Sequence, residues 1–309
     1  MNLTTSKILI QGMMEPMGSR YVPLMLNYGT PIAAGISPGH RGETIGGIPV
    51  FDMVEQAVAS QTQGSESVGA IDTSVILVQP YLVLDAALEA MAAGIRQLVI
   101  VTESVPPLDM VRITRKAEAT GTIVIGSSSP GIIVPGELLL GIHPAEFYKP
   151  GSIGLISRSG TLIYEVALTL TQAGLGQSIA ISIGGDRILG SSYDYWLNHL
   201  QQDSRTEAIV LVGEIGGDSE EQAAKYITEA IDKPVIAYIA GRTAPRRQVM
   251  GHSSAVITTQ ITDFDADLGT FDRKIAAMKQ AKIPVADRPS QIPDLLKKAL
   301  NGKRSLEKA

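Results

Sequence analysis

Short, continuous apolar runs recur along the whole chain and alternate with segments of helical periodicity. A strand that is covered on both faces buries every side chain, so its apolar pattern is continuous rather than alternating. Segment 82–94 is typical of the stretches in between, because its apolar residues fall at helical spacing and a glycine ends it. This repetition predicts an α/β fold with doubly wound parallel sheets. The predicted strands are residues 7–12, 31–37, 74–80, 97–103, 122–128, 152–159, 178–185, 207–217 and 234–241.

The length of the chain, 309 residues, predicts two domains rather than one. A stretch rich in proline and glycine interrupts the alternation after the fifth predicted strand, and such composition is typical of a connection. A last helical pattern at 291–302 precedes a basic C-terminal end. We therefore predict two doubly wound α/β domains. They comprise residues 1–130 and 152–302, with a linker at 131–151 and a tail at 303–309.

Composition excludes several classes of function. The net charge of −5 gives no electrostatic reason to expect nucleic acid or an anionic membrane as partner. The absence of cysteine excludes disulfides, thiol nucleophiles, iron–sulfur clusters and thiolate zinc sites. No leader pattern and no apolar stretch of membrane-spanning length is present, so we expect a soluble, cytoplasmic protein.

One acidic pattern resembles a calcium-binding loop. Asp263, Asp265 and Asp267 have the spacing of its first ligands, but Gly269 falls at the seventh position and Lys274 at the twelfth. An EF-hand requires glycine at the sixth position and glutamate at the twelfth. We interpret this stretch as an acidic approach to a helix at 268–281 and predict no resident metal site.

The loop after the first predicted strand is a candidate ligand site, because ligands of such sheets bind beyond the carboxyl ends of strands. Gly12 and Gly18 are six residues apart, so the loop lacks the GxGxxG pattern of dinucleotide-binding domains. The second strand is followed by no carboxylate before Glu43, which disfavours a nicotinamide oxidoreductase. His40 and Arg41 follow this strand, and either contact with a phosphate or a solvated turn is consistent with them.

Three features of the second half converge on one site. Residues 157–161, Ser-Arg-Ser-Gly-Thr, lie at a strand-to-helix junction, where small hydroxylated residues suit either an anion-binding helix N-terminus or an ordinary N-cap. Glu214 ends a strand, and His252 lies on the loop after another. Because all three follow strands of one parallel sheet, we expect them at the same edge.

A histidine, a carboxylate that can hold its second ring nitrogen, and an anion-binding helix N-terminus together describe a phosphohistidine site. The carboxylate would fix the tautomer, and the helix end would hold the phosphoryl oxygens. A Ser-His-acid hydrolase uses similar residues. The sequence disfavours it, since the stretch around Ser159 lacks the G-x-S-x-G pattern.

These residues resemble the α subunits of succinyl-CoA synthetase and related acid–CoA ligases, and the resemblance extends over nearly the whole chain. It implies an N-terminal Rossmann-like CoA-binding domain and a flavodoxin-like domain that carries a phosphorylated histidine. The motifs that carry it are SRSGTL (157–162) with YE (164–165), GGD (184–186), GEIGG (213–217), KPVIAYIAG (233–241) and MGH (250–252).

The resemblance also implies roles for individual residues. His252 and Glu214 would be catalytic, and Tyr164 would lie near the acyl substrate. The phosphate-binding residues would be Ser159, Gly160 and Thr161. The CoA-binding residues would be Gly12, Met14, Glu15, Pro16, Met17, His40, Arg41, Val101, Thr102 and Glu103.

In this family a separate β subunit with an ATP-grasp domain supplies the site for ATP or GTP with Mg²⁺, so the resemblance implies a hetero-oligomer. The implied reaction has three steps. A nucleoside triphosphate phosphorylates the histidine, the phosphoryl group passes to succinate, and CoA then attacks the succinyl phosphate. Malate or citrate are alternative acids in related enzymes.

The sequence departs from the family mainly in the CoA-binding half. Met14 and Glu15 replace a Thr-Gly pair, and Pro16 removes a backbone donor. A carboxylate in contact with a phosphate would repel it by roughly 1 to 4 kcal/mol. His40 stands where the family has lysine. A changed acid, a differently held CoA, and a non-catalytic or regulatory homologue that no longer binds CoA therefore remain alternatives.

Overall fold

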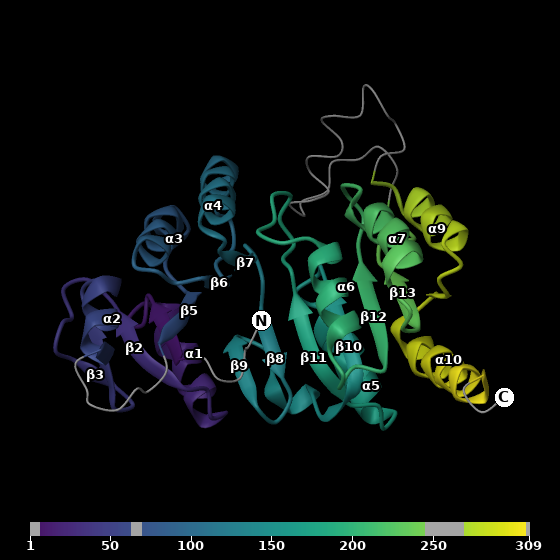
Figure 1. The fold of residues 1–309 in the computed structure, drawn as a ribbon, viewed down its shortest axis with the longest axis horizontal. Coiled ribbons are helices and arrows are strands. Elements are labelled where there is room, and N and C mark those ends of the chain that lie inside the picture. The colour runs from purple at the N-terminus through teal and green to yellow at the C-terminus, as the bar shows by residue number, and fades with distance from the viewer. Residues whose placement is uncertain (1–6, 63–69, 245–268, 307–309) are drawn as a thin grey trace. The chain divides into compact units, whose positions relative to one another are not determined.

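The computed structural model describes residues 7–62, 70–244 and 269–306. The chain forms two compact units. The first consists of Met1–Ala145 together with Ile188–Ser191, and the second of Glu146–Arg187 together with Ser192–Ala309. Each unit is built on a mainly parallel sheet (Figure 1).

The sheet of the first unit has the strand order β3-β4-β2-β1-β5-β6-β7. All neighbours are parallel except β3 and β4. Because β1 pairs with both β2 and β5, the strand order reverses at β1, and this is where such sheets bind ligands. The bounds are β1 Lys7–Gln11, β2 Ile32–Ile36, β3 Thr44–Ile45, β4 Ile48–Phe51, β5 Ile71–Ile76, β6 Gln97–Ile100 and β7 Ile123–Ile125.

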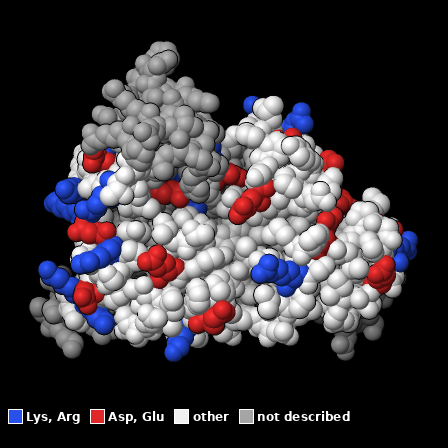
Figure 2. Space-filling model, turned by 180° about the vertical axis from the view of Figure 1, so that it is seen from behind, with Lys and Arg blue, Asp and Glu red and all other residues white. Residues whose placement is uncertain are grey.

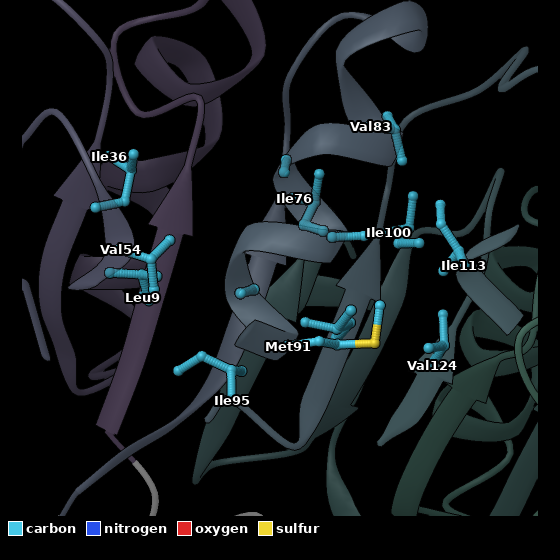
Figure 3. Packing of buried hydrophobic residues seen from close by; sticks show 14 of the residues in the cluster. Leu9, Ile36, Val54, Ile76, Val83, Met91, Ile95, Ile100, Ile113 and Val124 are labelled. Atoms are coloured by element: carbon cyan, nitrogen blue, oxygen red, sulfur yellow. The ribbon is translucent and has the colours of Figure 1, made fainter. Parts of the chain in front are cut away.

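Helices cover both faces of this sheet. Apolar side chains of β1, β2, β5, β6 and β7 pack against three helices in one buried cluster (Figure 3). Helix α1 contacts β1 and β9 but contributes no residue to this cluster, so it covers the opposite face. The bounds are α1 Pro16–Asn27, α2 Val54–Thr62, α3 Val83–Ala92 and α4 Pro107–Thr120, with the single-turn helix η1 at Pro80–Leu82.

The segment 131–151 contains regular structure that the predicted linker did not include. Strands β8 (Gly131–Val134) and β9 (Leu138–Gly141) form an antiparallel hairpin, followed by the single-turn helix η2 (Ala145–Phe147). Gly131 and Gly141 face each other, and a Cβ on Gly131 would lie 1.9 Å from the carbonyl oxygen of Leu140. These glycines therefore allow two strands to approach closely, whereas the sequence pattern predicted a linker without regular structure.

The second unit contains five parallel strands in the order β14-β13-β12-β10-β11. Strand β10 pairs with both β11 and β12, so this sheet also reverses its strand order, here at β10. The bounds are β10 Pro150–Ser157, β11 Gln177–Ser182, β12 Ala208–Gly213, β13 Val235–Ile239 and β14 Val285–Ala286.

Two groups of helices pack around this sheet. Helices α5 and α10 contact each other, while α6, α7 and α9 contact one another in succession. Both units are therefore doubly wound, and the predicted fold class is confirmed. The bounds are α5 Leu162–Gln172, α6 Tyr193–Gln202, α7 Ser219–Ala230, α9 Phe271–Gln280, α10 Ile292–Leu306 and the single-turn helix η3 Pro289–Gln291.

Each predicted apolar run overlaps a strand, but several predicted strands extend too far at their carboxyl ends, and β5 begins three residues before the predicted run 74–80. The run 207–217 is an example, because β12 ends at Gly213 and the residues that follow form a loop. In the described ranges no helix is long and apolar enough to cross a membrane. On the face drawn in Figure 2, basic and acidic side chains are interspersed among uncharged residues.

Candidate functional site

In the first unit, the loop after β1 lies where the strand order reverses. Gly12 has a φ of +85°, and a Cβ there would lie 2.9 Å from the backbone nitrogen of Val78. A Cβ on Gly18 would lie 2.1 Å from the carbonyl oxygen of Gly12. Both positions therefore require glycine, because α1 and the neighbouring strand end pack directly against the loop.

Most backbone donors of this loop are used within the protein. The N–H of Met13 donates to the carbonyl of Ile36 at 3.3 Å, and the N–H of Met14 donates to Ser37 Oγ at 2.9 Å. The N–H of Glu15 donates to the carbonyl of Gly12 at 3.1 Å, and Pro16 has no N–H. In this conformation residues 13–16 offer no free amide to a phosphate group.

A cavity of about 490 Å³ opens beside this loop. Three carboxylate residues line it, and one of them, Glu89, accepts a hydrogen bond from the N–H of Val54 at 2.9 Å. His40 also lines it and pairs with Glu43, 2.9 Å from Nδ1 to Oε1. The lining residues are Gln11, Gly12, Met14, Glu15, Pro16, Ile36, Ser37, Pro38, His40, Val78, Leu82, Asp85, Ala86 and Glu89.

The cavity includes only some of the residues that the sequence assigned to CoA. Gly12, Met14, Glu15, Pro16 and His40 line it. Asp85 and Glu89 also line the cavity but were not predicted. Both lie on α3, which follows β5, so their position after a strand end was the available signal in the sequence.

The other predicted CoA-binding residues do not belong to the cavity lining. Thr102 is buried, and its Oγ1 donates to the carbonyl of Val78 at 2.7 Å. The remaining four are buried Val101, half-buried Met17, and exposed Arg41 and Glu103.

In the second unit, the junction between β10 and α5 has the features of a helix cap. Ser159 is buried, and its Oγ accepts the N–H of Leu162 at 3.4 Å, while Ser157 Oγ donates to the carbonyl of Ser159 at 2.8 Å. The N-cap residue of α5 is Thr161, which makes no side-chain capping bond, so the hydroxyl of Ser159, two residues earlier, takes over that task by accepting the N–H of Leu162. A hydroxyl group that accepts a hydrogen bond still has a hydrogen to donate, so capping is compatible with phosphate binding.

Glu214 directly follows β12, the strand adjacent to β10. It is 5% exposed, and its backbone N–H donates to Glu220 Oε1 at 3.2 Å. The N–H of Arg158, which follows β10, donates to the carbonyl of Val212 at 3.2 Å. The fold therefore brings the loops of Glu214 and Ser159 to adjacent strand ends, at the reversal of strand order, as the parallel topology predicted.

A buried ionic network, which the sequence did not predict, adjoins Glu214. Arg158 Nη1 lies 3.4 Å from Glu220 Oε1, and Lys274 Nζ lies 2.5 Å from Glu220 Oε2 and 3.0 Å from Glu221 Oε2. Arg158 belongs to the SRSG motif, so the sequence did mark it as part of a candidate site. Glu220 and Lys274 lie on helices, and no motif in the sequence marks them.

In this buried network, the attraction between opposite charges offsets the cost of removing them from water. Burial alone would raise the pKa of the Glu220 carboxyl, but the charges of Arg158 and Lys274 outweigh burial and lower that pKa below its usual range. Burial likewise disfavours the charge on Arg158, but Glu220, Tyr193 and Glu214 raise its pKa. The directions of both shifts favour the charged forms of Glu220 and Arg158 in the folded protein.

The remaining predicted residues lie partly outside the described structure. Thr161 and Gly160 begin the turn into α5, and Tyr164 is half-buried on that helix. Burial, with a smaller contribution from Tyr164, raises the pKa of Tyr148. His252 lies outside the described residues. Among those described, no group of three metal-ligating side chains is present.

Two family models match the chain. The CoA binding domain model matches residues 4–104, and the CoA-ligase model matches residues 156–277. The first match contains the cavity loop, and the second contains the loops of Ser159 and Glu214.

Several curated proteins with similar sequences are α subunits of succinate–CoA ligases. The α subunit 2 of the ADP-forming succinate–CoA ligase of Archaeoglobus fulgidus is 41% identical over 295 residues, which cover 96% of this chain and 97% of that protein. The corresponding α subunit of Aquifex aeolicus is 40% identical over 297 residues, covering 96% of this chain and 92% of that protein.

A solved structure shares the fold. The ATP citrate lyase of Methanothrix soehngenii, in complex with citrate and coenzyme A, superposes with a TM-score of 0.84 at 20% identity. The match covers 98% of this chain but 51% of the lyase. Identity and coverage with the curated relatives establish the family. This chain belongs to the family of succinate–CoA ligase α subunits.

Proposed function

We propose that the chain is the α subunit of a nucleotide-dependent succinate–CoA ligase that acts through phosphorylated His252. The observation that carries this proposal is the adjacency of two loops at the ends of β10 and β12, one holding Ser159 and the other Glu214. These loops would supply the anion-binding and carboxylate parts that a phosphohistidine site requires. The names of the relatives that share 40% or more of their residues support the choice of acid.

The proposed chemistry transfers one phosphoryl group and one acyl group. The terminal phosphoryl of a nucleoside triphosphate moves to a ring nitrogen of His252, releasing the diphosphate. A succinate carboxylate oxygen then takes the phosphoryl from the histidine, which gives succinyl phosphate. The CoA thiolate attacks the acyl carbon and expels inorganic phosphate. All steps are reversible.

Within this chain, each group has a distinct task. Glu214 would accept a hydrogen bond from the second ring nitrogen of His252, which makes the reacting nitrogen more basic. Ser159, Gly160 and Thr161 would hold the phosphoryl oxygens at the start of α5, where the helix dipole favours negative charge. Tyr164, one turn into α5, would contact the acyl substrate.

CoA would use the cavity beside Gly12. Its apolar walls, Ile36, Val78, Leu82 and Ala86, suit an adenine ring, and about 490 Å³ accommodates part of the cofactor. The carboxylates around it and the internally bonded amides of residues 13–15 suit phosphate groups poorly. We therefore propose that CoA binds through its adenosine part and more weakly than in relatives with a Thr-Gly pair.

The nucleotide and Mg²⁺ would be bound mainly by a partner β subunit with an ATP-grasp domain. The α-subunit names of the relatives support the existence of such a partner.

The test is phosphorylation of the chain together with its candidate β subunit, using ATP labelled in the terminal phosphate. We expect label on the α chain that is stable until both CoA and succinate are added and is then discharged. Label that forms but is insensitive to CoA would replace the ligase with a phosphoryl-transfer or regulatory role. Malate and citrate in place of succinate identify the acid.

Replacing the two divergent residues of the CoA loop should strengthen CoA binding. In Met14→Thr/Glu15→Gly, a carboxylate that repels phosphate by roughly 1 to 4 kcal/mol is removed. Since about 1.4 kcal/mol corresponds to tenfold in affinity, we expect the Kd for CoA to fall at least about fivefold. Calorimetric titration measures it. Glu55→Gln, an exposed change at the start of α2, should leave the Kd unchanged. An unaltered Kd in the double variant would place CoA elsewhere.

A further inference from the structure

The loop that follows β12, residues 214–217, carries Glu214 and leads to Asp218, the N-cap residue of α7. Buried charges hold this loop. Glu220 Oε1 accepts the backbone N–H of Glu214 at 3.2 Å. Arg158 Nη1 donates to the carbonyl of Gly216 at 3.0 Å, and Lys274 Nζ donates to the carbonyl of Gly217 at 2.9 Å. The same charges that neutralise one another therefore also bind the loop backbone at three of its four residues.

The network is inside the protein. The side chains of Arg158, Glu220 and Lys274 are 3%, 0% and 0% exposed. They come from three elements that are far apart in sequence: the end of β10, the first turn of α7, and the first turn of α9. Tertiary folding thus concentrates three charges under one short loop.

Two glycines and close neighbouring elements shape this loop. Gly216 and Gly217 have φ values of +100° and +60°, and neither has a side chain that could pack. The start of α7 is close by, since a Cβ on Gly213 would lie 2.6 Å from Glu220 Cγ. The N–H of Gly216 also donates to the carbonyl of Gly269 at 2.8 Å. The conformation of the loop is therefore fixed by contacts from outside it.

Stability alone does not explain such a network. Replacing a buried ion pair by well-packed apolar side chains is often neutral or stabilising, because removing charges from water is costly. A geometric role is the alternative explanation, since hydrogen bonds from a rigid network fix atoms to within a fraction of an ångström.

We propose that Arg158, Glu220 and Lys274 are positioning residues that hold the backbone of Glu214 where its carboxylate can orient the phosphorylated histidine. The inference rests on the proposed function, because the role of Glu214 does. A misplacement of about 1 Å in such a site costs on the order of 100-fold in rate. We therefore expect loss of the network to slow phosphorylation about 10- to 100-fold.

The first variant is Glu220→Met/Lys274→Met, which removes both charges together and the acceptor for the Glu214 N–H. Phosphorylation of the αβ complex by labelled ATP is followed in a single turnover. Glu220→Gln/Lys274→Met keeps an oxygen for that N–H, so we expect it to recover most of the rate. The control is Lys225→Met/Glu229→Gln, which neutralises an exposed pair on the same helix, 3.9 Å apart. A double-methionine variant as fast as this control overturns the proposal.

A cycle with Glu214→Gln separates positioning from a structural effect. If the network acts through Glu214, Glu214→Gln slows the wild-type chain strongly but slows the double-methionine variant much less. Equal slowing in both backgrounds contradicts the proposal.

Arg158→Lys provides a second test if the double-methionine variant does not fold. It keeps the charge but shortens the side chain and loses the donor to Gly216, so we expect slower phosphorylation by a chain that still folds.

Backbone hydrogen exchange distinguishes failure of this inference from failure of the proposed function. We expect the amides of Glu214 and Gly216 to exchange at least tenfold faster in the double-methionine variant, while amides of α6 do not change. Unchanged exchange at Glu214 and Gly216 overturns the positioning role whether or not the chain is phosphorylated. Faster exchange in the double-methionine variant, combined with a wild-type chain that accepts no label, supports the anchoring of the loop and rejects the phosphohistidine.

Discussion

His252→Asn is expected to abolish labelling of the chain by the terminal phosphate of ATP. Asparagine keeps a polar side chain of similar size but has no nucleophilic nitrogen, so no phosphoramidate bond can form. The label on the wild-type chain should be lost in acid and retained in base, as for phosphate bound to nitrogen. The αβ complex is incubated with labelled ATP, and label on the α chain is quantified after separation in alkaline buffer.

The matched control for this experiment is His199→Asn. His199 is half-buried on α6, where it packs edge-on against Trp196, and the proposed mechanism does not use it. We expect full labelling of this variant. Label that persists in His252→Asn would assign the phosphate to another residue and would remove Glu214 from its proposed role.

Lys274→Met should lower the free energy of unfolding by about 3 to 5 kcal/mol, because it removes one partner of a buried ionic network and leaves Glu220 under-compensated. Lys274 is 0% exposed and pairs with both Glu220 and Glu221. Urea denaturation of the purified chain, followed by circular dichroism, measures the change.

The pH dependence of stability provides an independent check on the same variant. Burial raises the pKa of Glu220, but Arg158 and Lys274 bring it below its usual range, so this group stabilises the fold above its unfolded-state pKa. That contribution is lost as the pH falls through the lowered pKa. In Lys274→Met one compensating cation is absent, so we expect the acid-side loss of stability to begin at higher pH.

The control is Lys279→Met, which removes an exposed lysine from the last turn of the same helix. A cation at that place contributes about 0.3 to 1 kcal/mol through the helix dipole, so its loss should be small. Similar unfolding free energies for the two variants would contradict the assignment of Lys274 as a buried charge partner of Glu220.

The sequence determined the fold class because burial on both faces leaves a continuous apolar pattern in each central strand. It did not predict β3, β4 and β14, which are short strands toward the sheet edges, where few residues are buried. The hairpin β8–β9 was also missed. Its glycines allow close strand pairing, but in sequence they resemble the glycines of a flexible connection.

For the candidate site, too, the sequence predicted some features and not others. Parallel topology alone placed Ser159 and Glu214 at one edge of the sheet, since the carboxyl ends of parallel strands share an edge. The motif matches that led to the family were also local in sequence, and the curated relatives bear the family out.

Only the tertiary structure decided what surrounds these residues. Arg158 and Glu220 are 62 positions apart, and Glu220 and Lys274 are 54 apart, so no local pattern relates them. The carboxylates of the cavity beside Gly12 likewise come from the loop after β1 and from helix α3. A sequence pattern reports which face of an element is buried. It does not report which distant charge is buried with it, because that depends on how the elements pack together.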